Sequence, residues 1–136
     1  MLELEPYLFF YGKCEEALNF YKGIFGGKVS SIMRMKEAPP EMPSPPNWGD
    51  KIMHSRFESP SVKFMASDGR PDTVNTDGNI ALSLSTRDEA EGTRVFNKLS
   101  EGGTVDMPMQ DTFWGAKFGV LKDKYGIEWM VNCDKS

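Results

Sequence analysis

His54 and Arg56 are the side chains of this sequence best suited to acid–base chemistry and to binding an anion. His54 is the only histidine, and Arg56 follows it by two positions in the alternating run 52–58. Side chains alternate across a strand, so both residues share one face if this run is a strand. His54 could act as a base near neutral pH or orient a ligand carbonyl, and Arg56 could pair with a carboxylate or phosphate. A structural histidine and an arginine paired with an acidic side chain are the alternatives.

Glu128 and Trp114 are further candidates in the C-terminal part of the chain. Glu128 lies in the predicted strand 127–133. Burial beside apolar side chains would suit Glu128 to work as a general base, whereas a partly exposed glutamate near a strand end is the alternative. Trp114 precedes Gly115, and an indole next to a glycine in a strand offers a flat wall for stacking a ring.

The elements that must position these residues follow from periodicity and turn signals. Strands are expected at residues 6–11, 29–35, 52–58, 62–66, 79–85, 104–109, 116–121 and 127–133. The first helix has a buried stripe made of Cys14, Ala17, Leu18, Tyr21 and Phe25. The second helix begins with a capping box, in which Thr86 accepts from the backbone and Glu89 reaches back, and it runs to about Ser100. Residues 37–50, rich in proline, are expected to form a loop.

The order strand, helix, three strands occurs twice. We therefore expect an α+β fold of two βαβββ modules, about residues 4–67 and 78–134, within one domain spanning 1–136. Short repeats pack on each other because neither can bury its sheet alone. Two curved sheets with helices on their outer faces would enclose a cleft.

Four segments carry a resemblance to a known family: 7–12, 15–21, 25–27 and the run 111–129, which is rich in aromatic residues. Together they resemble the PhnB-like branch of the vicinal-oxygen-chelate superfamily (glyoxalase, bleomycin resistance protein, dioxygenase), also labelled 3-demethylubiquinone-9 3-methyltransferase-like. The resemblance implies an incomplete, glyoxalase-like barrel around a cleft, and a homodimer.

Enzymes of that superfamily hold a divalent metal with His, Glu or Gln side chains in the cleft. The resemblance places three of these ligand positions at Pro6, Asn79 and Met130, while a fourth near 65–67 has no clear alignment. Proline has no donor atom, methionine is a soft thioether and a neutral amide is a poor ligand alone. We therefore expect no cofactor and no catalytic metal, which argues against glyoxalase-type chemistry.

The same three positions predict which face of each strand lines the cleft. If Pro6 and Met130 point inward, so do Phe10 and Glu128, whereas Tyr7 and Phe9 point at the helices. The expected ligand-binding residues are Phe10, Arg56, Trp114 and Met130, and the candidate catalytic residues are His54 and Glu128.

Two classes of function fit these features. The first is a protein that binds a small, partly apolar molecule in the cleft without a metal, as bleomycin-resistance-type proteins do. The second is an enzyme, either a metal-dependent lyase or dioxygenase or a metal-free enzyme that uses His54 and Glu128. A methyltransferase is disfavoured, because no G-x-G-x-x-G turn occurs in the sequence.

Composition limits partners and location. A net charge of −4 argues against nucleic-acid binding. The sequence has no apolar run near the roughly 20 residues of a membrane span, and its N-terminus does not look like a secretory signal. Cys14 and Cys133 lie far apart, so we expect two reduced thiols in a cytoplasmic protein.

Overall fold

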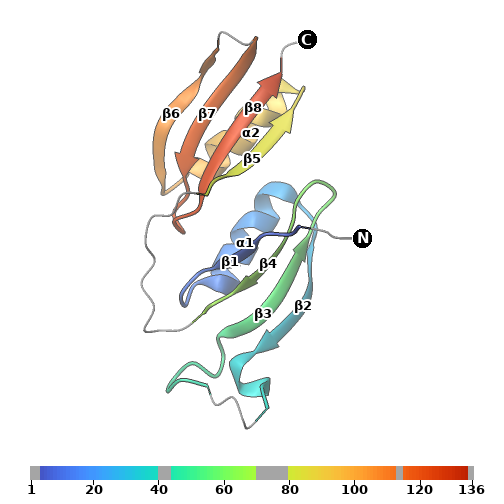
Figure 1. The fold of residues 1–136 in the computed structure, drawn as a ribbon, viewed down its shortest axis with the longest axis vertical. Helices are drawn as coiled ribbons and strands as arrows, with labels where there is room; N and C mark the ends of the chain where they lie inside the picture. Colours follow the sequence, from blue (N-terminus) through green and yellow to red (C-terminus); the bar gives the residue numbers. More distant parts are fainter. Residues whose placement is uncertain (1–3, 40–43, 70–79, 113–114, 135–136) are drawn as a thin grey trace. The chain divides into compact units, whose positions relative to one another are not determined.

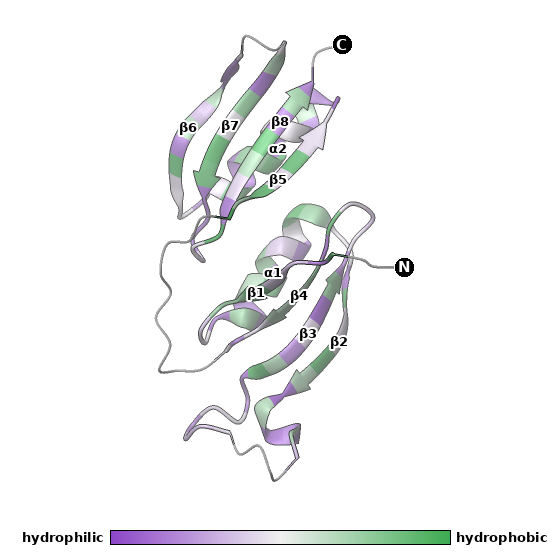
Figure 2. Cartoon of the chain, viewed as in Figure 1, coloured by the Kyte–Doolittle hydropathy of each residue, from purple (hydrophilic) through white to green (hydrophobic). Residues whose placement is uncertain are grey.

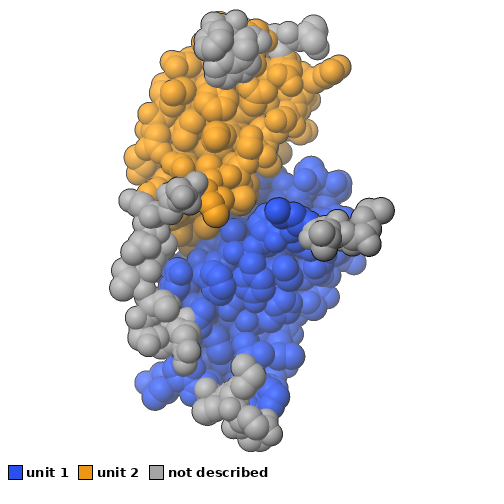
Figure 3. All heavy atoms as spheres, viewed as in Figure 1, with its two compact units in different colours: residues 1–75 blue, residues 76–136 orange. Residues whose placement is uncertain are grey.

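The computed structural model of the chain describes residues 4–39, 44–69, 80–112 and 115–134. Contacts group the chain into two compact units, residues 1–75 and 76–136 (Figure 3). No helix in these described ranges is long and apolar enough to cross a membrane.

The first unit is one βαβββ module (Figure 1). Its elements are β1 (Tyr7–Phe9), α1 (Cys14–Phe25), β2 (Lys28–Arg34), the short 3-10 helix η1 (Met35–Glu37), β3 (Ile52–Glu58) and β4 (Lys63–Ser67). The strands form one sheet in the order β1-β4-β3-β2. β1 runs parallel to β4, and the other neighbours are antiparallel.

The second unit repeats this arrangement. Its elements are β5 (Leu82–Thr86), α2 (Glu89–Ser100), β6 (Thr104–Asp111), β7 (Ala116–Lys122) and β8 (Glu128–Asp134). The sheet order is β5-β8-β7-β6, with β5 parallel to β8. The predicted α+β fold of two βαβββ modules is confirmed, and each sheet is open rather than closed on itself. The prediction of one domain around a shared cleft stays a prediction.

Helix α1 forms where the sequence carries its apolar stripe. Four of the five predicted positions are buried, and Ile24 takes the place predicted for Phe25. Gly26 then ends the helix with φ 72°, a left-handed conformation that glycine adopts at little cost. Figure 2 shows hydrophobic and hydrophilic residues interleaved along the strands, as sheets with one buried face require.

The predicted start of helix α2 was wrong by two residues. Thr86 is the last residue of β5, where it pairs in register with Cys133, so it cannot cap the helix. Asp88 is the N-cap instead, and its side chain accepts a hydrogen bond from the Glu91 backbone N–H at 3.2 Å. The Thr86 hydroxyl accepts a hydrogen bond from the Asp88 backbone N–H and so helps to position the N-cap residue.

Matching glycines allow close approach in both modules. A Cβ on Gly27 would overlap the carbonyl oxygen of Glu58, and a Cβ on Gly103 would overlap that of Lys122. Each glycine lies at the start of the strand that follows its helix, and each contacts the end of the neighbouring strand. The internal repeat therefore includes these packing contacts as well as the order of the elements.

Helix α2 lies close against its sheet at Gly92. A Cβ there would overlap the Cys133 sulfur, whereas a Cβ on Gly23 of helix α1 would meet nothing within 4 Å. Alanine is favoured over glycine by about 1 kcal/mol in a helix interior, but overpacking a well-packed core costs about 1–3 kcal/mol.

We predict that Gly92→Ala lowers the free energy of unfolding and that the matched variant Gly23→Ala raises it by about 0.5–1 kcal/mol. Urea unfolding followed by circular dichroism measures both. Equal stabilisation by the two substitutions would contradict the close contact between α2 and β8.

Candidate functional site

The face assignment predicted for β1 was wrong. Phe10 is only 4% exposed, and its ring lies 6.0 Å from that of Tyr21 in helix α1. Tyr7 and Phe9 are 37% and 46% exposed instead. Phe10 therefore belongs to the core and is not a cleft wall. The segment Tyr7–Tyr11 is aromatic or aliphatic at every position, so its pattern did not reveal which face is buried.

Four rings form a continuous row across the exposed side of the first sheet. Tyr7 stacks on Phe9 with ring centroids 5.1 Å apart, and Phe9 lies 6.4 Å from Tyr11. On the other side of Tyr7, the His54 ring lies at 5.7 Å. We call His54, Tyr7, Phe9 and Tyr11 the aromatic row. The sequence reasoning found His54 but placed Tyr7 and Phe9 against the helix.

Tyr7 also holds His54 through a hydrogen bond. The Tyr7 hydroxyl oxygen lies 3.0 Å from His54 Nδ1. Burial raises the pKa of the Tyr7 phenol. The phenol therefore keeps its proton well above neutral pH, and the pair offers hydrogen-bonding groups beside a flat aromatic surface.

Arg56 is engaged by acidic side chains of its own module. Its guanidinium lies 2.9 Å from Glu5 Oε1 and 2.9 Å from Glu58 Oε1. The hydrogen bond to Glu58 raises the pKa of Arg56, and the same bond holds the pKa of Glu58 below its usual value. This is the internal ion pairing left open as the alternative to ligand binding.

In the second module, the structure places Glu128 and Met130 on the face of β8 away from helix α2. Both are partly buried, whereas Trp129 and Val131 are each 1% exposed and belong to the core. Glu128 is in register with Lys122 of β7, and Met130 with Val120. This alternation agrees with the predicted one. Trp114 and Asn79 lie outside the described residues.

The residues that the resemblance places at the superfamily's metal positions are poor ligands for a hard cation. Pro6 has no side-chain donor and Met130 has a thioether, while such a cation prefers carboxylates or imidazoles. Within the described ranges, no three His, Cys, Asp or Glu side chains are grouped as a metal site needs. The two cysteines are free and buried, and burial raises the pKa of the Cys14 thiol to about 12.

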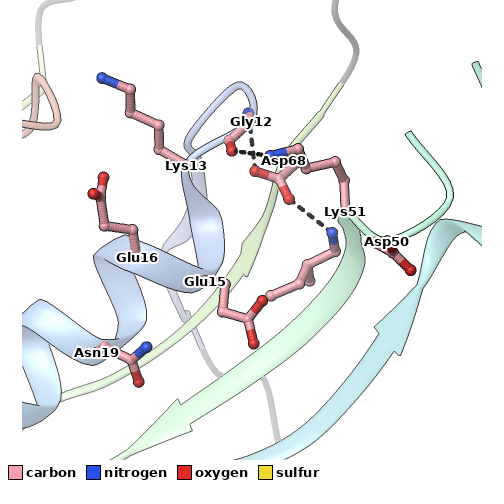
Figure 4. Close-up of a pocket in the computed structure, with 9 residues that line it drawn as sticks. Gly12, Lys13, Glu15, Glu16, Asn19, Asp50, Lys51 and Asp68 are labelled. Carbon is pink, nitrogen blue, oxygen red and sulfur yellow. Dashed lines mark hydrogen bonds between the residues drawn. The ribbon is translucent and has the colours of Figure 1, made fainter. Parts of the chain in front are cut away.

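A pocket of about 630 Å³ lies beside the start of helix α1 (Figure 4). Its lining residues are Gly12, Lys13, Glu15, Glu16, Asn19, Asp50, Lys51, Ile52 and Asp68. Figure 4 shows the Asp68 carboxylate in the middle of this group and the Lys51 amine reaching the Gly12 carbonyl, at 2.8 Å. The sequence reasoning did not single out this pocket.

Asp68, which lines this pocket, binds backbone groups from separate segments of the chain. The carboxylate accepts hydrogen bonds from the backbone N–H groups of Gly12, Cys14 and Ile52 at 2.9, 2.8 and 2.7 Å. Two of these N–H groups are at the start of helix α1, where unpaired donors favour a negative charge. Because Asp68 fills that position and is itself 1% exposed, we interpret the group as a lock that joins α1, β3 and β4.

We predict that Asp68→Asn lowers the free energy of unfolding by about 2–3 kcal/mol, because an amide replaces a charged acceptor of three hydrogen bonds. Asp50→Asn is the matched control, since the Asp50 carboxylate is exposed and forms a screened ion pair with Lys36. Urea unfolding of both variants measures the difference. A loss for Asp68→Asn no larger than that for Asp50→Asn would contradict the lock.

Comparison with known proteins identifies the family. The family model described as 3-demethylubiquinone-9 3-methyltransferase matches residues 3–132. Protein YjdN of Escherichia coli is 30% identical over 142 aligned residues, covering 98% of this chain and 97% of the relative.

Solved structures agree with this match. A Pseudomonas aeruginosa protein is 39% identical, with a TM-score of 0.87 over 100% of both chains. A Bacillus cereus protein, titled a putative 3-demethylubiquinone-9 3-methyltransferase and PhnB protein, is 30% identical with a TM-score of 0.79, covering 97% of this chain and 99% of that one. A glyoxalase-related enzyme from Fulvimarina pelagi, 16% identical with a TM-score of 0.62 over 98% of this chain and 89% of that one, shares the fold. This chain therefore belongs to the PhnB-like family that is described as 3-demethylubiquinone-9 3-methyltransferase.

Proposed function

We propose that this protein binds a small, partly apolar molecule against the aromatic row of the first sheet, and that it does so without a catalytic metal. The observation that carries the proposal is the exposure of stacked rings beside a hydrogen-bonded Tyr7–His54 pair. Small-molecule sites combine apolar and aromatic surface with a few fixed polar groups, and this row supplies both.

The exposure of these rings supports a ligand rather than a purely structural role. Phe9 keeps 46% of its surface accessible, although a ring in a sheet gains free energy when apolar neighbours cover it. Contiguous exposed apolar surface on a folded protein commonly marks a binding site. Arg56, on the same strand as His54, is ion-paired with Glu5 and Glu58.

We extend the proposal to the exposed face of the second sheet. There Met130 offers an adaptable apolar contact and Glu128 offers a carboxylate, both on one face of β8. A metal-free reaction that uses His54 and Glu128 stays a prediction, as does the metal-dependent alternative.

We do not extend the family description to methyl transfer. Each sheet of this chain has one parallel and two antiparallel neighbour pairs, whereas nucleotide-type cofactors bind to doubly wound parallel sheets with a glycine-rich turn. The binding proposal needs no such turn.

We predict that Phe9→Ala weakens binding of para-ethylphenol by about 0.5–1.5 kcal/mol, because the substitution removes one stacking surface. Ile32→Ala is the matched control. Ile32 is 41% exposed, but its register partner is the buried Ser55, so it lies on the other face of the sheet. Saturation-transfer NMR gives both affinities.

The same titration tests whether ligand binding requires a metal ion. Binding by the parent protein should survive dialysis against a chelator unchanged. Loss of binding after dialysis, or equal effects of Phe9→Ala and Ile32→Ala, would contradict the proposal.

We also propose a homodimer. The edge strands β2 and β6 carry exposed apolar residues, with Met33 at 40% and Val105 at 45% exposure. Such edges invite pairing with a second chain, and most soluble oligomers are symmetric homo-oligomers. Sedimentation at micromolar concentration is expected to give twice the mass of one chain, and a pure monomer would contradict this prediction.

A further inference from the structure

The ring nitrogens of His54 have different surroundings. Nδ1 lies 3.0 Å from the Tyr7 hydroxyl, and the described part of the chain contains no hydrogen bond to Nε2. A neutral imidazole carries its proton on one nitrogen and accepts on the other, so the partner of Nδ1 decides what Nε2 can do.

Neighbouring groups favour Tyr7 as the donor in this bond. Within the described residues, the Tyr7 hydroxyl makes no hydrogen bond other than the one with His54 Nδ1. Nδ1 is therefore the one protein acceptor available to the Tyr7 proton, and the hydroxyl donates to it.

We infer that Tyr7 holds His54 in the tautomer with its proton on Nε2, and that this N–H selects small neutral aromatic molecules that carry an acceptor oxygen, such as aryl ketones. The inference rests on the proposed function and names the class of ligand for the aromatic row. Tyr7 is a positioning residue here, because it acts on the ligand's oxygen through His54.

The geometry supports both parts of this ligand class. The Tyr7 and Phe9 rings form a stacked surface adjoining His54, so a ligand ring that stacks there comes close to the imidazole. An N–H recognises acceptors only, and a ligand without an acceptor leaves it unpaired, which costs binding free energy.

The local charges favour a neutral ligand over an anion. Arg56 shares a strand with His54, but its guanidinium is paired with both Glu5 and Glu58. One cation between two carboxylates leaves no uncompensated positive charge to attract a ligand carboxylate.

The tautomer can be measured directly, because His54 is the only histidine of the chain. NMR of protein with isotope-labelled histidine should show one set of ring signals, with the proton on Nε2. Tyr7→Phe should shift the population toward the other tautomer, and Tyr125→Phe, the same change in the second module, should not. A parent protein with its proton on Nδ1 would overturn the inference.

The ligand class is tested with two matched probes, acetophenone and ethylbenzene, which differ by the carbonyl oxygen, so only the ketone carries an acceptor. The parent should prefer the ketone by about three- to tenfold, the usual range for one net hydrogen bond. His54→Phe should remove this preference while both probes still bind, and His54→Gln, which keeps an N–H donor, should restore part of it. Tyr7→Phe should reduce the preference, whereas Tyr125→Phe in the second module should keep it.

The outcomes separate this inference from the proposed function. Equal affinities for the two probes, both lowered by Phe9→Ala, would overturn the selection by His54 and leave the binding site in place. Failure of both probes to bind at the aromatic row would overturn the inference and the proposed function together.

Discussion

Each four-stranded sheet is packed against a single helix of its own module, and this one-sided packing governs the rest of the structure. The helix side takes the large apolar residues, such as Phe64 and Trp129, each 1% exposed. The other side receives no helix of its own module within the described ranges. Residues that alternate with the core therefore stay accessible, and on the first sheet these are the rings of Tyr7 and Phe9.

Each module contains a buried aspartate directly after one of its strands. Asp68 joins the start of helix α1 to β3 through three backbone N–H groups. In the second module Asp123 accepts from the N–H groups of Tyr125 and Ile127 and from the indole N–H of Trp129. A buried carboxylate is tolerated only where donors surround it. These two residues are acidic for structural reasons, so an acidic side chain beside a pocket was no guide to chemistry here.

On the exposed face of the first sheet, one polar side chain has a structural role and another is a candidate for ligand binding. Arg56 lies on the inner strand β3, and its charge is balanced by Glu5 and Glu58. His54 has one nitrogen bound to Tyr7 and sits at the end of a stacked row. Alternation along β3 brings both residues to one face of the sheet. They differ because acidic side chains lie next to Arg56 and form ion pairs with it.

Local sequence patterns were enough to predict the elements, their duplicated order and the family. Apolar stripes, glycine stops and alternation are local signals, and they placed α1, β3 and the turn before β8 within one or two residues of their positions. They also indicated that Glu128 and Met130 share a face and that Trp129 is in the core. The cap of helix α2 was misplaced, because the pairing of Thr86 with Cys133 is a contact between distant segments.

The buried face of β1 could not be predicted from the sequence, because it depends on packing against helix α1. Every residue from Tyr7 to Tyr11 can be buried or exposed, so the choice depends on Tyr21 of helix α1, which packs against Phe10. The same packing turned Tyr7 toward His54, across a separation of 47 residues. Local patterns carry no information about such a pair, because its distance is set by the register of three strands and not by spacing along the chain.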